Sequence, residues 1–282
     1  MVIHVVQSGD SLYRIAQQYG VPLAFLLAQN GLRESARLTP GQTIVVPQPV
    51  RTYTVQRGDT LTGIAARTGV PLLTLWQNNP QLGGGERIFP GQLLALAYPE
   101  PKLGTFTVNG YAYPSIDMQV LRRTLPYLTY LSVFSYGFDR TGRLLPPAGA
   151  ASLVRAARQY GAAPLLVLTT LGEDGRFSGE RARMLFANPT ARAALIENLA
   201  ALIAAEGYAG VDIDFEYIPP EDTAAYAAFV RDVRARLAPN GWQVFVSLAP
   251  KTSAAQRGLL YEAHDYPALG AAADKALLMT SE

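Results

Sequence analysis

The N-terminal part of the chain repeats one short pattern of apolar and polar positions. An alternating run at residues 3–7 predicts a strand. Apolar residues spaced three and four apart over residues 12–19 predict a helix, which Gly20 ends. Pro22 opens a second short helix, and residues 43–46 form a second strand that we expect to pair with the first. The pattern therefore predicts a small unit of strand, helix, helix and strand.

A second copy of this unit follows directly. The sequence His-Val-Val-Gln-Ser-Gly-Asp-Ser-Leu at residues 4–12 returns as Tyr-Thr-Val-Gln-Arg-Gly-Asp-Thr-Leu at residues 53–61. Pro-Gly-Gln at residues 40–42 returns at residues 90–92, after a one-residue insertion in the glycine run 83–85. Repetition at this short period indicates two small modules of the same kind.

The pattern changes after residue 104. Apolar runs rich in β-forming residues now alternate with alanine-rich amphipathic stretches, which is typical of strand and helix units around a parallel sheet. The predicted strands are residues 105–111, 130–136, 164–168, 210–216, 243–248 and 275–279. The predicted helices are residues 148–160, 189–206 and 221–237. In such α/β folds, function lies at the carboxyl ends of the strands.

Composition excludes several classes of site and partner. The chain of 282 residues has no cysteine and two histidines, which excludes disulfides, thiolate chemistry and an ordinary zinc site. A net charge of +2 provides no basic excess for nucleic acid or anionic lipid. No apolar run reaches the roughly 20 residues of a membrane helix, and the N-terminus has no recognisable signal peptide. We therefore expect no cofactor, no metal, and neither nucleic acid nor a membrane as partner.

Three acidic residues on one predicted strand carry the strongest chemical signal. Side chains alternate along a strand, so Asp212, Asp214 and Glu216 share one face. Carboxylates this close cannot all ionise in a restricted environment, and at least one should hold a raised pKa and serve as an acid. The same ladder could instead hold a hard cation, or face water on an edge strand. The apolar residues between them, such as Val211 and Phe215, favour a buried central strand.

The repeated unit closely resembles the LysM module, a small βααβ domain that binds glycans containing N-acetylglucosamine. The resemblance covers both copies almost completely. It implies a sugar groove between the turn after the first strand and the loop after the second helix. The residues at those positions are Gly9, Asp10, Ser11, Leu12 and Asn30 in the first copy, and Gly58, Asp59, Thr60, Leu61 and Asn79 in the second. Because such residues are also typical of helix ends, a purely structural role for them stays open.

The segment from Ala209 to Glu216 resembles the catalytic strand of glycoside hydrolase family 18, whose motif is Asp-Gly-x-Asp-x-Asp-x-Glu. Ala209 replaces the first aspartate, and the three acidic residues that follow are kept. Residues 132–138 and 247–252 are similar to the spore germination, cortex-lytic branch of that family, in which LysM units precede the barrel. The resemblance implies LysM domains at residues 1–48 and 51–98, followed by a (β/α)8 TIM-type barrel over residues 103–282.

A complete barrel of this family has eight strands, so the resemblance implies a C-terminally truncated, incomplete barrel of about six strands. Ser281 stands where the family carries a tyrosine that holds the acetamido group. The implied activity is hydrolysis of β-1,4 bonds next to N-acetylglucosamine in peptidoglycan of the spore cortex, or in a chitin-like glycan. The implied mechanism is substrate-assisted and retaining. In it Glu216 protonates the leaving oxygen, Asp214 orients the acetamido group, and Asp212 shares or raises the proton of Asp214.

Aromatic residues near the strand ends are further candidates for sugar contact. Tyr111, Tyr113, Tyr136 and Tyr217 could stack on sugar rings, although aromatics also fill cores. We expect His264 and Asp265 in a solvated loop without a role. The competing hypothesis is a non-catalytic wall or spore-coat protein, in which the LysM pair binds glycan and the barrel is inactive. Under either hypothesis the resemblance implies a location in the spore coat or cortex, or in the cell wall.

Overall fold

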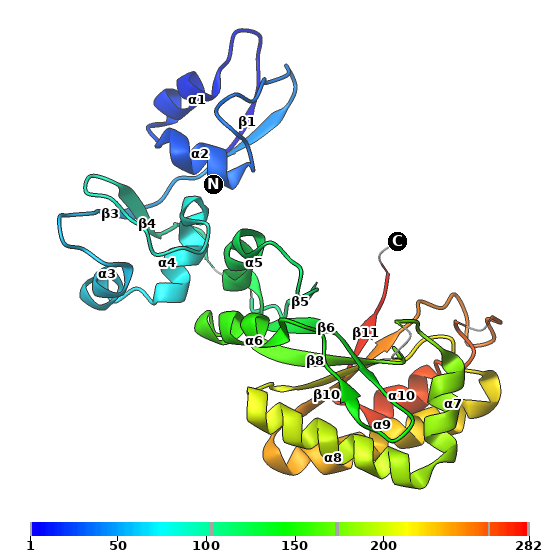
Figure 1. Cartoon of the computed structure of the whole chain (residues 1–282). Helices are drawn as coiled ribbons and strands as arrows, with labels where there is room; N and C mark the ends of the chain where they lie inside the picture. The colour runs from blue at the N-terminus through cyan, green and yellow to red at the C-terminus, as the bar shows by residue number, and fades with distance from the viewer. Residues whose placement is uncertain (1, 102–103, 173–174, 259, 281–282) are drawn as a thin grey trace. The chain divides into compact units, whose positions relative to one another are not determined.

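The structure, a computed structural model, describes residues 2–101, 104–172, 175–258 and 260–280 (Figure 1). Ser281, which the family resemblance singled out, lies outside the described residues. The chain divides into two compact units. One comprises Met1–Thr107 with Asp117–Tyr127, and the other comprises Val108–Ile116 with Leu128–Glu282.

The first repeat folds as the predicted strand, helix, helix and strand. Its elements are β1 (Val2–Val5), α1 (Leu12–Tyr19), α2 (Leu23–Gln29) and β2 (Thr43–Val46), with β1 antiparallel to β2. Ser11 begins α1, because its Oγ accepts a hydrogen bond from the Arg14 N–H at 3.2 Å. Gly20 ends the helix in the left-handed conformation that glycine tolerates best. Apolar side chains of both helices and β2, including Ile15, Leu26 and Ile44, form the small core.

The second repeat folds in the same way. Its elements are β3 (Arg51–Thr54), α3 (Leu61–Thr68), α4 (Leu72–Asn78), a 3-10 turn η1 (Pro80–Leu82) and β4 (Leu93–Ala97). Thr60 takes the place of Ser11, since its Oγ1 accepts from the Gly63 N–H at 3.0 Å. Gly69 ends α3 as Gly20 ends α1. The two repeats therefore use equivalent residues to begin and end equivalent helices.

A short helix that follows the first barrel strand groups with the second repeat. It consists of α5 (Met118–Thr124) and the 3-10 turn η2 (Leu125–Tyr127). The Gln77 Nε2 donates to the Pro126 carbonyl at 2.8 Å. Gly84 lies so near α5 that a Cβ there would be 2.1 Å from the Arg122 carbonyl oxygen. Gly84 therefore permits a close approach that a larger residue would block. The compact units differ from the predicted domain limits in this segment.

The second unit is built on one sheet. Its parallel strands are β5 (Asn109–Ala112), β6 (Tyr130–Phe138), β8 (Ala163–Thr169), β9 (Gly210–Asp214), β10 (Gln243–Leu248) and β11 (Lys275–Leu278). They lie side by side in chain order, and the short strand β7 (Leu144–Leu145) pairs antiparallel with the end of β6. Within the described residues the sheet thus contains six parallel strands in barrel order, which confirms the predicted incomplete barrel.

Helices connect and cover these strands. They are α6 (Ala150–Gln159), α7 (Gly179–Ala187), α8 (Pro189–Glu206), α9 (Thr223–Leu237) and α10 (Tyr266–Ala272), with 3-10 turns η3 (Pro220–Asp222) and η4 (Ala238–Asn240). Figure 1 shows α8 and α9 along one side of the sheet. The three predicted helices are confirmed as α6, α8 and α9, whereas α5, α7 and α10 were not predicted. Within the described residues, every helix is too short or too polar to cross a lipid bilayer.

Strand β9 is central, between β8 and β10, and every residue in it is buried. Directly after the strand, the Phe215 ring stacks on Tyr226 and Phe229 of α9, with ring centroids 5.7 and 5.6 Å apart. The alternate residues of β9, beginning with Asp212, therefore point away from the helices into the interior of the half-barrel. This arrangement excludes the exposed edge strand that the sequence left open.

Candidate active site and sugar grooves

Asp212 is completely buried and is surrounded by hydroxyl groups from three other strands. Its Oδ2 accepts from the Tyr111 hydroxyl at 2.6 Å and from Ser132 Oγ at 3.2 Å. Its Oδ1 accepts from Ser247 Oγ at 3.0 Å. Sequence reasoning missed Ser132 and Ser247, although both lie in the segments that carry the family resemblance. Hydrogen bonds from β5, β6 and β10 thus hold the innermost carboxylate in one orientation.

All three carboxyl groups have raised pKa values. Burial raises the pKa of Asp212, against the opposing effect of its hydroxyl donors. Burial, together with the charges of Asp212 and Glu216, raises the pKa of Asp214 to about 7. Burial also raises the pKa of the half-buried Glu216. The expectation that at least one of these groups keeps its proton near neutral pH agrees with these shifts.

The outer two carboxyl groups line a cavity of about 490 Å³ at the carboxyl ends of the strands. Its walls are aromatic and apolar, and its lining residues are Tyr111, Tyr113, Phe134, Asp214, Glu216, Ala249, Pro250, Leu260 and Met279. Tyr113 and Phe134 meet edge to face with centroids 4.9 Å apart. We call this cavity the cleft. Sequence reasoning did not predict Phe134, Leu260 or Met279, because apolar residues at strand ends give no distinct signal.

The predicted aromatic contacts differ in exposure, and Tyr113 lines the cleft as predicted for a sugar contact. Tyr111 lines the cleft, with 46% of the residue exposed and its hydroxyl on Asp212. Tyr217 directly follows Glu216 and is 45% exposed, so it stays a candidate. Tyr136 is 2% exposed, and its hydroxyl lies 2.8 Å from the Tyr208 hydroxyl in the core. The prediction that Tyr136 contacts sugar is therefore wrong, because the ring is covered by protein.

The first repeat contains a cavity of about 540 Å³ where the family resemblance places a sugar groove. Its lining residues are Asp10, Ser11, Leu12, Tyr13, Leu23, Glu34, Ala36, Arg37 and Leu38. The turn after β1 and the segment after α2 thus face each other across this cavity. Gly9 gives the turn its shape with a φ of 89°, and Gly58 does the same in the second repeat with a φ of 88°.

In the second repeat, the equivalent turn consists of Gly58, Asp59, Thr60 and Leu61. Asp59 Oδ2 accepts from the Gln56 N–H at 2.7 Å, and Thr60 caps α3. The Leu61 side chain is 2% exposed and belongs to the core. These contacts show how the turn is held, and direct sugar contact by its residues stays a prediction.

Asn30 and Asn79 have internal partners. The Asn79 Nδ2 donates to the Leu75 and Ala95 carbonyls, each at 2.8 Å, and its Oδ1 accepts from the Ala95 N–H at 2.8 Å. Asn30 makes the equivalent three bonds to Leu26 and Val45. Each amide thus ties the second helix of its repeat to the closing strand. We correct the predicted sugar contact of Asn79, because its side chain is completely buried and its amide is engaged by backbone, whereas sugar contact by the half-buried Asn30 stays a prediction.

His264 and Asp265 also differ from expectation. His264 is 1% exposed, so the prediction of a solvated loop is wrong for this residue. Asp265 Oδ1 accepts from the Ala268 N–H at 3.1 Å and begins α10. Both residues close the loop between β10 and α10, which also lines the cleft.

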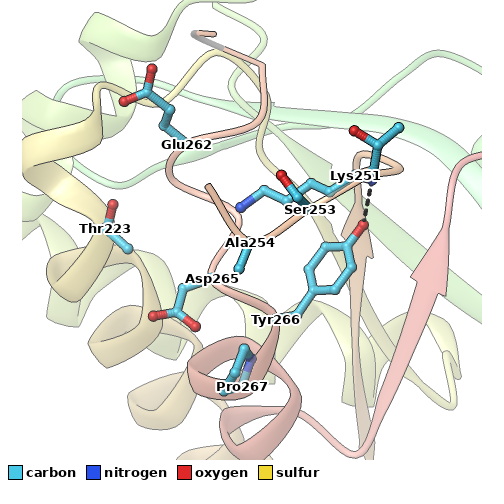
Figure 2. Close-up of a pocket in the computed structure, with 9 residues that line it drawn as sticks. Thr223, Lys251, Ser253, Ala254, Glu262, Asp265, Tyr266 and Pro267 are labelled. Atoms are coloured by element: carbon cyan, nitrogen blue, oxygen red, sulfur yellow. Dashed lines mark hydrogen bonds between the residues drawn. The ribbon is translucent and has the colours of Figure 1, made fainter. Parts of the chain in front are cut away.

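The same loop contributes to a second cavity of about 470 Å³, shown in Figure 2. Its lining residues are Thr223, Lys251, Thr252, Ser253, Ala254, Glu262, Asp265, Tyr266 and Pro267. The Lys251 N–H donates to the Tyr266 hydroxyl at 2.9 Å, as the dashed line in Figure 2 marks. Pro250 lines the cleft and Lys251 lines this second cavity, so one loop shapes both.

Comparison with protein families agrees with this architecture. The LysM domain model matches residues 4–47 and 53–96, and the model of glycosyl hydrolases family 18 matches residues 167–282. The chain carries two LysM domains and a family 18 glycosyl hydrolase domain. The family 18 match includes β9 and all three acidic residues. The predicted domain limits enclose these matches and remain predictions at their ends.

Individual relatives share both kinds of domain over the whole chain. The chain is 35% identical to the cortical fragment-lytic enzyme of Bacillus anthracis over 99% of this chain and 65% of that protein. It is also 35% identical to the Bacillus subtilis cortical fragment-lytic enzyme, over 100% of this chain and 66% of that protein. The crystal structure of the Bacillus cereus spore cortex-lytic enzyme SleL superposes with a TM-score of 0.74 at 34% identity, over 99% of this chain and 65% of that chain. The chain thus spans about two thirds of the length of these relatives.

Proposed function

We propose that this chain hydrolyses β-1,4 glycosidic bonds next to N-acetylglucosamine in the peptidoglycan of the spore cortex. The observation that carries the proposal is the pair Asp214 and Glu216 lining an aromatic cleft, with Asp212 buried behind them. Aromatic walls suit the apolar faces of sugar rings. The choice of cortex is supported by relatives that are named as cortical fragment-lytic enzymes.

In the first step, the protonated Glu216 gives its proton to the glycosidic oxygen as the bond to the anomeric carbon breaks. Burial favours the protonated form of Glu216 and so keeps the acid available. The acetamido carbonyl oxygen of the same sugar attacks the anomeric carbon, so the substrate supplies the nucleophile. Asp214 accepts a hydrogen bond from the acetamido N–H and stabilises the positive charge that develops on this group.

In the second step, the Glu216 carboxylate takes a proton from water, and the oxygen of that water attacks the anomeric carbon. The bond to the acetamido oxygen breaks, and the sugar leaves with its original configuration. Asp212 raises the pKa of Asp214 through its charge, and it takes up the proton that Asp214 releases when the acetamido N–H becomes a donor to Asp214. The hydroxyls of Tyr111, Ser132 and Ser247 hold Asp212 in place during both steps.

The LysM domains bind the same glycan outside the cleft. The cavity of the first repeat, between the turn after β1 and the segment after α2, supports this part of the proposal. Binding through these domains would place the protein at the spore cortex or the cell wall.

The proposal is tested with Glu216→Gln. We expect glycan cleavage to fall at least about 1,000-fold, because the substituted amide cannot donate a proton to the leaving oxygen. Products released from purified cortex fragments are identified by mass spectrometry. Glu262→Gln is the matched control, since it makes the same change in the neighbouring cavity of Figure 2. Equal product formation by Glu216→Gln and the parent chain would contradict the proposal. A parent chain that is retained on cortex but releases no product would favour a purely glycan-binding protein.

A further inference from the structure

His264 is a buried side chain that joins the ends of two neighbouring strands. Its Nδ1 accepts from the Ala249 N–H at 2.8 Å, and Ala249 directly follows β10. Its Nε2 lies 3.0 Å from the carbonyl oxygen of Phe215, which directly follows β9. Both ring nitrogens are therefore bonded to backbone groups beside the cleft.

These two bonds define the protonation state of the ring. The Ala249 N–H can only donate and the Phe215 carbonyl can only accept, so Nδ1 carries no proton and Nε2 carries one. Burial and the nearby Lys251 charge lower the pKa of His264, which favours this neutral form. A second proton on the ring would point at the Ala249 N–H. The two hydrogen bonds of His264, which we call the clamp, therefore require the neutral tautomer.

The clamp acts on the residue between the two acidic groups of the cleft. The Phe215 ring is already fixed by its stacking on Tyr226 and Phe229. His264 fixes the carbonyl of the same residue, from which the chain continues into Glu216. The Glu216 carboxylate has no hydrogen-bond partner among the described residues, so its place in the cleft depends on its backbone.

We propose that His264 is a positioning residue, which fixes the Glu216 backbone relative to the loop from Ala249 to His264 that walls the cleft. The inference rests on the proposed glycosidase function and deepens it. Pro250 and Leu260, from that loop, line the same cleft as Asp214 and Glu216. One imidazole thus sets the separation between the proton donor and the wall against which a sugar would lie.

Tyr266 offers a matched control in the same region. Its hydroxyl donates to the Ala249 carbonyl at 2.6 Å. The same hydroxyl accepts from the Lys251 N–H at 2.9 Å, the bond drawn in Figure 2. It therefore ties the base of the same loop but does not bond to Phe215. Loss of the Tyr266 hydroxyl releases the loop alone, whereas loss of His264 releases the loop and the backbone of Glu216.

The activity test compares His264→Leu, His264→Gln and Tyr266→Phe with the parent chain on cortex fragments. A displacement of about 1 Å at a reacting group can cost about 100-fold in rate, so we expect His264→Leu to lower kcat by about that factor with KM within about twofold. Glutamine can place one donor and one acceptor on the two backbone groups, so His264→Gln should recover kcat to within about fivefold of the parent. Tyr266→Phe should stay within about threefold.

A second measurement does not depend on catalysis. Carbon-13 NMR of the side-chain carboxyl groups follows the titration of Glu216, assigned by Glu216→Gln, in the same set of variants. Asp214 interacts with both Asp212 and Glu216, and Lys251 is the charged group near His264; all three of these neighbours are unchanged throughout. The titration midpoint of the Glu216 carboxyl should shift in His264→Leu and stay unchanged in His264→Gln and Tyr266→Phe. In the parent, nitrogen-15 chemical shifts of His264 should show an unprotonated Nδ1.

The outcomes separate this inference from the proposed function. A parent chain that cleaves nothing, with the expected Glu216 shift in His264→Leu, contradicts the glycosidase proposal and leaves the positioning role supported. A cleaving parent with equal kcat and an unmoved Glu216 midpoint in His264→Leu overturns the positioning role. If His264→Leu does not fold, failure of His264→Gln to restore more activity than His264→Asn overturns it as well.

Discussion

Aspartates occupy two contrasting environments in this molecule. In the LysM turns, Asp10 and Asp59 accept backbone N–H groups, and these hydrogen bonds are the largest cause that lowers the pKa of each carboxyl. On β9, burial raises the pKa of Asp212 and Asp214. The same side chain is thus stabilised as an anion in one region and disfavoured as an anion in the other.

The two aspartate environments differ in how many hydrogen-bond donors each carboxylate has. Asp59 is held by the Gln56 N–H, the Tyr53 hydroxyl and Arg67, so its charge is matched by donors. Asp214 has a buried Oδ1 without a hydrogen-bond partner among the described residues. A buried polar atom without a partner costs free energy, and such groups are concentrated at functional sites. The comparison therefore supports the proposal that β9 is the functional strand, on grounds that do not depend on a sequence motif.

The largest expected effect is on catalysis. Asp214→Asn should lower glycan cleavage about 1,000-fold, because the neutral amide no longer stabilises the charged acetamido group. Initial rates on cortex fragments measure the loss. Asp232→Asn, a change on the exposed face of α9 beside Arg192, serves as control and should keep the parent rate. A rate for Asp214→Asn within about tenfold of the parent would exclude the proposed role.

The same substitution should stabilise the fold at alkaline pH. The folded pKa of Asp214 is about 7, above the ordinary value of 3.8. The folded state therefore binds this proton more tightly, and the associated stability is lost as the pH rises from about 4 to about 8. Asp214→Asn avoids that loss. It should raise the free energy of unfolding by up to about 4 kcal/mol at pH 8 and by little at pH 4.

Urea denaturation at both pH values measures this difference. Trp242 reports on the family 18 domain when Trp76 is replaced by phenylalanine, since these are the chain's two tryptophans. Equal stabilisation at pH 4 and pH 8 would show that burial of the Asp214 charge is not the cause.

A somewhat smaller effect is expected in the second LysM domain. Asn79→Ala removes a buried amide and leaves the Leu75 carbonyl and both backbone groups of Ala95 without these partners. We expect a loss of about 3 kcal/mol in the stability of this domain. Trp76 fluorescence in a Trp242→Phe background follows its unfolding. Asn78→Ala, which loses one bond to the Leu96 carbonyl, should cost about 1 kcal/mol, and equal losses would argue against the internal role of Asn79.

The smallest effect is expected at the turn itself. The folded pKa of Asp59 is lowered, so its stabilising contribution is present above its ordinary pKa of 3.8 and is lost as the pH falls through the lower folded value. Asp59→Asn should therefore lower the melting temperature of the domain at pH 7, and the difference from the parent should shrink in acid, below the ordinary carboxyl pKa. Calorimetry at pH 7 and in acid measures this. If the difference in melting temperature is the same in acid, the shape of the side chain and not its charge causes the effect.

The sequence predicted those features that depend on residues close together in the chain, such as helix ends and the alternation of side chains along a strand. Gly20, which the pattern predicted to end the first helix, does so. Ser11 and Thr60, which belong to residue types typical of helix ends, cap the first helix of each repeat. The two-residue alternation on β9 also placed the acidic residues on one face. Short helices such as α7 and α10 were missed because they offer too few turns for a clear period.

Tyr136 shows why alternation fails as a guide to the cleft. On β6, Ser132 contacts Asp212 and Phe134 lines the cleft, so a regular strand would point Tyr136 the same way. The pairing of β6 with β8 shifts register between Val133 and Tyr136. Such an irregularity re-aims the side chains beyond it. The tyrosine is therefore buried against Tyr208, and no pattern in the sequence reveals the shift.

The sequence by itself determined the domain order and the strand on which three acidic residues share one face, because these depend on periodicity and motif. Tertiary structure decided which groups surround them. Tyr111, Ser132 and Ser247 reach Asp212 from three different strands, and His264 reaches Phe215 from a distant loop. Such contacts join residues far apart in the chain, and only the packing of the half-barrel brings their donors and acceptors within bonding distance.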